Sequence, residues 1–317
     1  MTVLTETQIT GRHAPSALKR VLDEGRFAVT AEMTPPVSTD PTDFKARAQS
    51  LRGLADAVNV TDGAGAKSHL STLAAAHFLI GAGVEPILQV TCRDRNRIAL
   101  QSDLLGAYAL GVRNVLLLGG DDPKTGDQPD AKPVFDLDSR GLLALAQKMR
   151  TERKLLPGTE IKGGFDLFIG AADLPADPPP GWDAKGLKAK ADAGADFIQT
   201  QFCMDMGLVR RYAARLVELG VAPRLKILVG ISPIPSPRSA RWMKEKLFGT
   251  VIPDTIVDRL DKAADAKAEG KRICIGLMQE LAEIPGIAGA HIMAPQNMSA
   301  IPEVIAAAGL QGKRRAG

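Results

Sequence analysis

Cysteine is scarce in this sequence of 317 residues, and its scarcity excludes two kinds of structure. Cys92, Cys203 and Cys274 are odd in number and lie far apart along the chain. Such spacing predicts neither a disulfide framework nor a C-x-x-C zinc site, so we expect no bound metal. Unpaired cysteines fit a reducing compartment, and we predict a cytoplasmic location.

Aromatic residues and long apolar runs are also rare. Aromatic residues make up 4% of the chain, whereas hydrophobic residues as a whole make up 45%. The core is therefore expected to consist mainly of alanine, valine, leucine and isoleucine, which suits buried parallel strands covered by helices. No apolar stretch is long enough to cross a bilayer, and residues 1–12 lack the apolar segment of a signal peptide. We predict no membrane partner.

The chain carries little net charge. The 40 lysines and arginines exceed the 36 aspartates and glutamates by only four. No basic run is interleaved with aromatic residues, so we expect no nucleic-acid partner. The short basic tail, residues 313–317, is interpreted as a solvated terminus.

The chain is instead rich in short apolar runs that alternate with helical patterns, as in repeated βα units. Residues 1–26 are interpreted as a leader and a short helix over residues 15–24 that could plug one end of a barrel. The expected strands are residues 27–33, 57–61, 86–91, 114–118, 160–167, 197–201, 225–229 and 290–293. The expected helices are residues 42–54, 68–82, 94–110, 139–150, 184–193, 207–219 and 254–281, with Asp94 as the N-cap of the third.

Eight βα units predict an α/β fold, a single-domain (β/α)₈ TIM barrel over residues 27–312. A doubly wound open sheet gives the same alternation, and strand order cannot be deduced from the period alone. We favour the barrel.

In such a barrel the working residues lie at the carboxyl ends of the strands. Polar residues expected there are Glu32, Thr61, Asp62, Gln89, Thr91, Asp121, Asp122, Asp166, Thr200, Gln201, Ser232 and His291. A pocket role for His291 has no further support in the sequence.

Glu32 is the first candidate for chemistry, because it ends an apolar strand and is followed by Thr34-Pro35-Pro36. A carboxyl group that loses water in a barrel mouth suits a general acid. The alternative is a glutamate on the outer face, or one paired with a neighbouring strand. Asp121, after two glycines, could accept hydrogen bonds from a heterocycle, and the amide of Gln201 could both donate and accept; an ordinary loop is the alternative for both.

Several segments, in order and spacing, resemble the methylenetetrahydrofolate reductase family. They are Ala31-Glu32-Met33-Thr34-Pro35-Pro36, residues 58–64 (VNVTDGA), residues 119–123 (GGDDP), residues 187–195 (LKAKADAGA) with Thr200-Gln201-Phe202, and residues 230–234 (GISPI). Each motif is weak alone, but their combination over residues 27–295 is specific.

The resemblance implies a barrel that binds FAD and reduces 5,10-methylenetetrahydrofolate, a reduced folate, to 5-methyltetrahydrofolate with NADH or NADPH. It implies that Glu32 is the general acid, that Asp121 contacts the pterin, and that Gln201 orients folate and nicotinamide. The implied cofactor side comprises Thr61, Gln89, Gly119, Gly120, Asp121, Ala171, Asp183 and Lys190. Arg238 or Arg241 could hold the anionic glutamate tail of folate. We also expect a homo-oligomer.

The departures from the family pattern fall on the flavin side. Gly119 stands where an arginine is usual, and Gln89 where a histidine is usual. Residues 168–175 replace a Tyr-Pro-Glu-x-His-Pro motif. Two alternatives therefore stay open. One is flavin-independent direct hydride transfer, or the same reaction in the oxidising direction. The other is a non-catalytic folate-binding partner subunit, against which the joint presence of Glu32, Asp121 and Gln201 argues.

Overall fold

The computed structural model describes residues 15–295 and 297–316, so the expected leader, residues 1–14, lies outside the described residues. Eight parallel strands pair in sequence order, and β8 closes on β1, which confirms the (β/α)₈ barrel and excludes an open sheet. The strands are β1 (Ala28–Met33), β2 (Ala57–Val60), β3 (Pro86–Thr91), β4 (Asn114–Leu118), β5 (Phe168–Asp173), β6 (Phe197–Phe202), β7 (Lys226–Ile231) and β8 (Ile287–Ile292).

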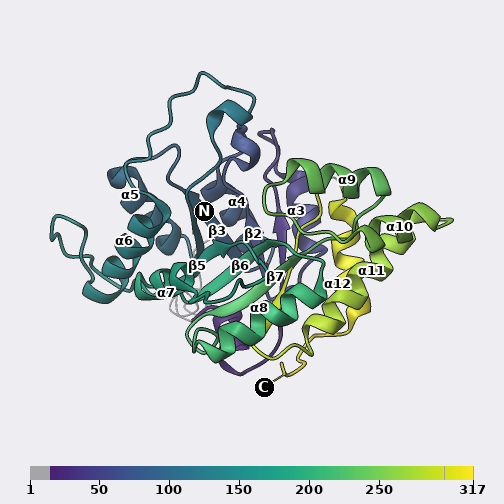
Figure 1. Ribbon diagram of the computed structural model, residues 1–317. Helices are drawn as coiled ribbons and strands as arrows, with labels where there is room; N and C mark the ends of the chain where they lie inside the picture. Colours follow the sequence, from purple (N-terminus) through teal and green to yellow (C-terminus); the bar gives the residue numbers. More distant parts are fainter. Residues whose placement is uncertain (1–14, 296, 317) are drawn as a thin grey trace.

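Helices surround the strands (Figure 1). They are α2 (Ala17–Asp23), α3 (Thr42–Gln49), α4 (Thr72–Gly81), α5 (Arg97–Ala109), α6 (Ser139–Glu152), α7 (Lys185–Asp192), α8 (Met206–Glu218), α9 (Pro237–Lys246), α10 (Asp254–Lys262), α11 (Ala266–Leu281) and α12 (Ile301–Ala308). Short 3₁₀ turns are η2 (Ala64–Ala66), η3 (Pro123–Thr125) and η4 (Met298–Ala300). Helices α9 and α12 were not among the helices expected from the sequence.

The prediction of the fifth strand was wrong. Residues 160–167 precede β5, because an antiparallel bridge between Lys154 and Glu160 and a positive φ at Gly163 turn the chain there. Asp166 is consequently not a strand-end residue; it is exposed and pairs with Arg153 at 2.8 Å. Residues 168–175, which replace the Tyr-Pro-Glu-x-His-Pro motif of the family, contain β5.

Two helix boundaries also need correction. The predicted helix 254–281 is two helices, α10 and α11, because the Asp265 carboxylate caps a new helix by accepting from the Ala268 N–H at 2.9 Å. The N-cap of α5 is Asn96, which accepts from Ile98 and Ala99. Asp94 pairs with Arg93 instead.

Helix α2 closes the amino-terminal end of the barrel, as the sequence predicts. Leu18, Val21 and Leu22 contact a buried cluster formed by the first residues of the strands. The Glu85 carboxylate accepts from the N–H groups of Ala17 and Leu18 at 2.7 and 3.1 Å, which anchors the start of the helix. Among the residues that the structure describes, the end open to ligands is therefore the opposite one.

Inside the barrel the chemistry changes from one layer to the next, because alternate residues of each strand face inward. The layer next to α2 is apolar and comprises Ala28, Ala57, Ile87, Leu116, Phe168, Phe197, Leu228 and Ala288. The next inward-facing layer, two residues further along the strands, is polar. Its buried members are Thr30, Asn59, Gln89 and Gln199, together with His291 of β8. This polar layer is the floor of the barrel mouth.

Gly170 shows how tightly the interior is filled. A Cβ at this position would lie 2.3 Å from Cζ of Phe197, whose buried ring stacks on Phe168 with centroids 4.9 Å apart. We predict that Gly170→Ala lowers the free energy of unfolding by about 1–3 kcal/mol through overpacking. Urea unfolding measures this.

Gly186→Ala is the matched control. A Cβ at Gly186 meets no atom within 4 Å, and this glycine lies in α7. Alanine there should leave stability unchanged or raise it by about 0.5–1 kcal/mol. Equal effects of the two substitutions would contradict the packing argument.

Candidate functional site at the barrel mouth

Glu32 faces the inside of the barrel mouth, and two other strands meet it there. The Gln89 side chain on β3 donates a hydrogen bond from Nε2 to Glu32 Oε2 at 3.0 Å. His291 on β8 places Nε2 3.8 Å from the same oxygen. The Glu32 side chain is 24% exposed. The carboxyl group is thus held from below while its other edge remains accessible from the mouth.

The polar layer below Glu32 was missed by the sequence reasoning, apart from Gln89 and an unsupported mention of His291. Thr30, Asn59 and Gln199 come from β1, β2 and β6 and bond with one another and with His291. A signal was present. Thr30 precedes Glu32 by two residues and Gln199 precedes Gln201 by two, which is the period of inward-facing residues in a strand.

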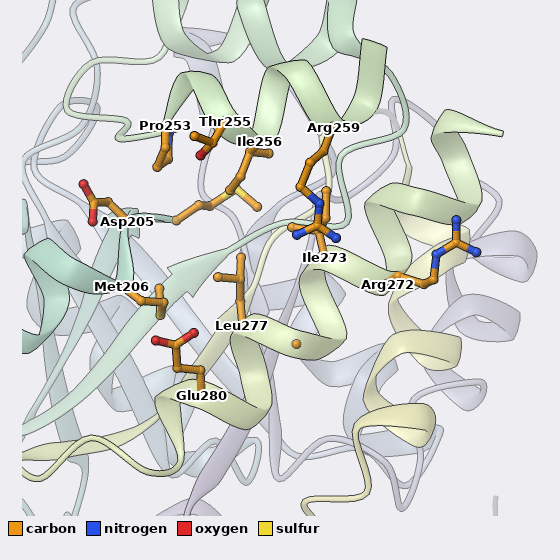
Figure 2. Close-up of a pocket in the computed structure, with 12 residues that line it drawn as sticks. Asp205, Met206, Pro253, Thr255, Ile256, Arg259, Arg272, Ile273, Leu277 and Glu280 are labelled. Atoms are coloured by element: carbon orange, nitrogen blue, oxygen red, sulfur yellow. The ribbon is translucent and has the colours of Figure 1, made fainter. Parts of the chain in front are cut away.

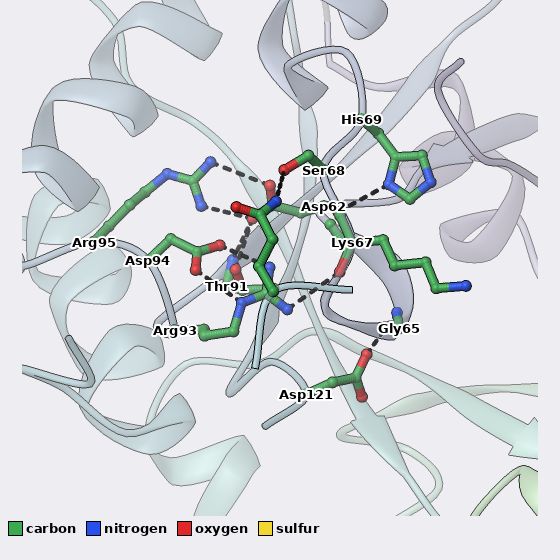
Figure 3. A network of polar contacts seen from close by, with 12 residues as sticks. Asp62, Gly65, Lys67, Ser68, His69, Thr91, Arg93, Asp94, Arg95 and Asp121 are labelled. Carbon is green, nitrogen blue, oxygen red and sulfur yellow. Dashed lines mark hydrogen bonds and ion pairs between the residues drawn. The ribbon is translucent and has the colours of Figure 1, made fainter. Parts of the chain in front are cut away.

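Asp121 lies in the loop after β4 and is bound to the loop after β2. Its Oδ2 accepts from the Gly65 N–H at 2.9 Å. The two loops also meet where Gln128 donates to the Ser68 hydroxyl at 2.8 Å. A Cβ on Gly126 would lie 2.0 Å from the Ala66 carbonyl oxygen, so only glycine permits this approach. The loops therefore form one connected rim, part of which Figure 3 shows.

Asp62 and Thr91, both predicted at strand ends, bond to each other and to the rim. Asp62 Oδ2 accepts from the N–H and the hydroxyl of Thr91, and Arg95 binds the carboxylate through both terminal nitrogens, at 2.7 and 3.1 Å (Figure 3). Beside them Arg93 binds the Asp94 carboxylate through Nε and one terminal nitrogen, and its other terminal nitrogen donates to the Gly63 carbonyl. The four charged side chains are therefore paired with one another, and they line a cavity of about 290 Å³.

Gln201 connects the end of β6 to the rim loop between α9 and α10. Its Oε1 accepts from the Phe202 N–H at 3.0 Å, and its Nε2 donates to the Phe248 carbonyl at 3.2 Å. The Phe248 residue is 84% exposed. An aromatic ring so open to water, next to a fixed amide, offers a flat apolar surface to a planar ligand. The sequence reasoning missed Phe248.

Four residues on the predicted cofactor side differ in how well they suit a flat cofactor. Thr61 is buried, yet its hydroxyl has no hydrogen-bond partner among the described residues, so a bound group could supply one. A Cβ on Gly119 would meet no atom, which leaves open space at this strand end. Gly120 adopts φ +98°, but a Cβ there would lie 2.9 Å from the Arg93 side chain. Ala171 belongs to the buried cluster between the strands and the helices, so it does not face the barrel mouth. Thr61 and Gly119 therefore fit a flavin, whereas the position of Ala171 does not.

Two further predicted cofactor residues, Lys190 and Asp183, already have partners within the protein. Lys190 donates to the Ala172 carbonyl at 2.6 Å and pairs with Asp173 at 2.9 Å. The Asp173 carboxylate also accepts from the Tyr212 hydroxyl at 2.6 Å, and burial together with this carboxylate raises the pKa of Tyr212 above its ordinary value. Asp183 accepts from the Lys185 N–H at the start of α7. Lys190 would have to exchange partners to hold a ligand, whereas Asp183 is exposed and has its second carboxylate oxygen free of contacts with the described residues.

The two candidate arginines on α9 differ in availability. Arg241 pairs with Asp261. Arg238 is exposed in the first turn of α9, and no ion pair or hydrogen bond of its side chain is found within the described residues. Arg238 is therefore the better placed of the two to bind an anion.

A second cavity, of about 500 Å³, lies outside the barrel between α10, α11 and the start of α8 (Figure 2). Apolar side chains of Ile256, Ile273 and Leu277 line it together with Arg259 and Arg272, which both pair with Glu269. None of the predicted site residues lines this cavity.

Thiol chemistry does not fit the site. All three cysteines are buried and free. Burial raises the pKa of Cys92 and of Cys203 to about 11, which keeps both thiols protonated and unreactive at neutral pH. Over residues 15–295 and 297–316 no helix is both long and apolar enough to cross a membrane, and no group of three or more metal-binding side chains is found.

Comparison with known proteins gives one family. The protein-family model described as methylenetetrahydrofolate reductase matches residues 17–309. A probable NADPH-type methylenetetrahydrofolate reductase of Caenorhabditis elegans is 28% identical over 248 residues, which are 76% of this chain and 34% of the relative. The 5,10-methylenetetrahydrofolate reductase of Pectobacterium carotovorum subsp. carotovorum is 28% identical over 224 residues, 67% of this chain and 65% of the relative. The chain thus spans about a third to two thirds of these relatives.

Among solved structures, an uncharacterized protein from Clostridium thermocellum is similar, with a TM-score of 0.64 and 16% identity. The match covers 92% of this chain and 97% of that chain. That protein is described as binding two copies of 5-methyl-5,6,7,8-tetrahydrofolic acid. At this identity the likeness shows the fold.

The unpartnered hydroxyl of Thr61 leads to a prediction about stability. Thr61→Val removes a buried polar atom that has no partner, so the unfolding free energy of the ligand-free protein should stay the same or rise by up to about 1 kcal/mol. Thr91→Val is the control. It removes the hydroxyl that donates to Asp62 at 2.9 Å, and should cost about 1–2 kcal/mol. Equal losses in urea unfolding would show that the Thr61 hydroxyl does have a partner.

Proposed function

Because this chain belongs to the methylenetetrahydrofolate reductase family, we propose that it reduces 5,10-methylenetetrahydrofolate to 5-methyltetrahydrofolate with NADH or NADPH, through FAD. The observation that carries the proposal is Glu32, whose carboxyl group lies at the barrel mouth with Gln89 on one side and an accessible edge on the other. An acid held in this way favours an enzyme over a non-catalytic folate-binding subunit. A cytoplasmic homo-oligomer belongs to the same proposal.

Glu32 acts as the general acid in the opening of the methylene bridge. As the carbon–nitrogen bond of the bridge breaks, the departing nitrogen takes a proton and the methylene carbon becomes an iminium at the other nitrogen. A hydride then adds to that carbon and forms the methyl group, so one hydride and one proton are consumed. Gln89 occupies Oε2 of Glu32, and Oε1 has no partner among the described residues, which leaves it free to present the proton.

Asp121 and Gln201 orient the substrate. The Asp121 carboxylate binds Gly65 through Oδ2, and its other oxygen can accept from N–H groups of the pterin. Gln201 fixes the rim segment that carries the exposed Phe248 ring, against which a planar ring of the folate or the nicotinamide stacks. Arg238 binds the anionic tail of the folate.

Thr61 and Gly119 would hold the flavin in this proposal, with the Thr61 hydroxyl as a hydrogen-bonding group and the Gly120 backbone beside it. A bound FAD would supply the hydride carrier between the reduced nicotinamide and the folate. A second candidate is direct hydride transfer from NAD(P)H to the folate. The contacts of Lys190 favour this second candidate. Lys190 already bonds to Asp173 and to the Ala172 carbonyl, so it is not free to contact a flavin as predicted.

The deciding experiment is anaerobic consumption of NADH by the purified protein, with and without methylenetetrahydrofolate and with no flavin added. The visible spectrum of the same sample is recorded throughout. Folate-dependent consumption with a flavin spectrum supports the proposal, and folate-dependent consumption without one supports direct transfer. No consumption with NADH or NADPH, even after FAD is added, would overturn both.

We predict that Glu32→Gln lowers folate-dependent turnover by about 10²–10⁴-fold, because the amide cannot supply the proton. Oxidation of NADH with an artificial acceptor such as menadione should change little in a flavin-dependent enzyme. The control is Glu152→Gln, a surface glutamate paired with Lys148. Wild-type folate turnover in Glu32→Gln would rule out the acid role.

A further inference from the structure

The polar layer below Glu32 crosses the barrel and leads to the proposed acid. Thr30, Asn59, Gln199 and His291 belong to β1, β2, β6 and β8, and none is more than 3% exposed. In such a dry interior each donor must find an acceptor, because an unmatched polar group costs about 1–3 kcal/mol. The positions of the hydrogens can therefore be deduced from the order in which the groups contact one another.

The two amides are oriented as a pair. Asn59 Nδ2 donates to Gln199 Oε1 at 2.6 Å, and Gln199 Nε2 donates to Asn59 Oδ1 at 2.9 Å. Rotating either amide alone would place nitrogen against nitrogen and oxygen against oxygen, and rotating both would turn Gln199 Oε1 toward His291. The structure has the orientation in which Gln199 Nε2 faces Thr30 and His291. One N–H of Gln199 remains, and it points between Thr30 Oγ1 at 3.1 Å and His291 Nδ1 at 3.3 Å.

This remaining N–H determines which nitrogen of His291 carries the proton. Nδ1 faces the Gln199 amide N–H and lies 2.9 Å from the Thr30 hydroxyl oxygen. A second hydrogen on Nδ1 would oppose the amide hydrogen, so Nδ1 is the acceptor. The Thr30 hydroxyl donates to it, since the alternative acceptor, the Ala290 carbonyl, is more distant at 3.4 Å. The ring proton is then on Nε2, the nitrogen that faces Glu32.

We propose that Gln199 is a positioning residue that, with Thr30 and Asn59, fixes the Nε2–H tautomer of His291, so that Glu32 faces a donor and not a lone pair. The inference rests on the acid role proposed for Glu32. In the other tautomer, Nε2 would accept the acidic proton of Glu32 and direct it away from the folate. With Nε2–H in place the proton points to the mouth, and the carboxylate left after its transfer gains a donor. The present Nε2–Oε2 separation of 3.8 Å closes to a hydrogen bond with a shift of about 1 Å.

The tautomer can be measured without any activity assay. In ¹⁵N-labelled protein, two-bond proton–nitrogen correlations distinguish the two tautomers of each of the four histidines, and His291→Asn assigns the signal. We expect His291 of the wild-type protein to carry its proton on Nε2. Gln199→Leu should abolish this preference. A proton on Nδ1 in the wild-type protein would overturn the inference, whether or not Glu32 is the acid.

Thr30 provides a matched pair of variants, which also serves if Gln199→Leu does not fold. Thr30→Val removes the donor to Nδ1 and should weaken the tautomer preference, whereas Thr30→Ser keeps the hydroxyl and should retain it. Folate-dependent turnover should fall about tenfold in Gln199→Leu and Thr30→Val, a loss of about 1.4 kcal/mol in transition-state stabilisation, and recover in Thr30→Ser. Menadione-dependent NADH oxidation should stay unchanged.

The two proposals fail in different ways. If Glu32→Gln retains folate turnover, the acid role fails while the tautomer measurement still stands. If the tautomer changes in Gln199→Leu but folate turnover stays at the wild-type level, the positioning role of Gln199 is wrong although the acid role survives. A tautomer that is unchanged in both Gln199→Leu and Thr30→Val would show that other groups fix the ring.

Discussion

Closure of eight parallel strands around a filled interior is the constraint on which the rest of this structure depends. Closure sends every second residue of each strand inward, and the strands are only four to six residues long. The interior thus has room for an apolar layer at the amino-terminal end, one polar layer above it, and the mouth. Because α2 covers the apolar end, chemistry is possible only at the opposite end, where Glu32 lies.

A polar layer inside a barrel is costly unless every group in it is matched. The reciprocal bonds between Asn59 and Gln199 satisfy most of the amide groups, and the one N–H left over is directed at Thr30 and His291. An all-apolar layer would fill the same space with less risk of an unmatched group. The polar layer is explained if it holds the proposed acid above it, since two of its members, Gln89 and His291, approach Glu32.

The sequence predicted much of this arrangement from periodicity, and what it missed depends on distant contacts. The bounds of β3 and β4 were predicted to the residue, because continuous apolar runs end there in turn residues. β5 was missed because its small residues, such as Gly170, make sense only beside Phe197 on the next strand. Placing Glu32 at the mouth needed only its position in β1, whereas its contact with Gln89 depends on barrel closure. The polar layer that contains Thr30 and Gln199 could have been predicted from sequence, because every second residue of a strand faces the same side and these two precede Glu32 and Gln201 by two residues.

The departures from the family pattern do not all lie in one part of the site. Gly119 follows β4, and residues 168–175 form β5 and the start of the next loop, beside the cluster of Lys190, Asp173 and Tyr212. Gln89 instead lies on β3 and donates to Glu32 itself. The acid, Glu32, is retained in spite of all three departures. A chain can therefore retain the folate acid while its hold on the cofactor changes, and for this reason the cofactor has to be established separately from the chemistry at Glu32.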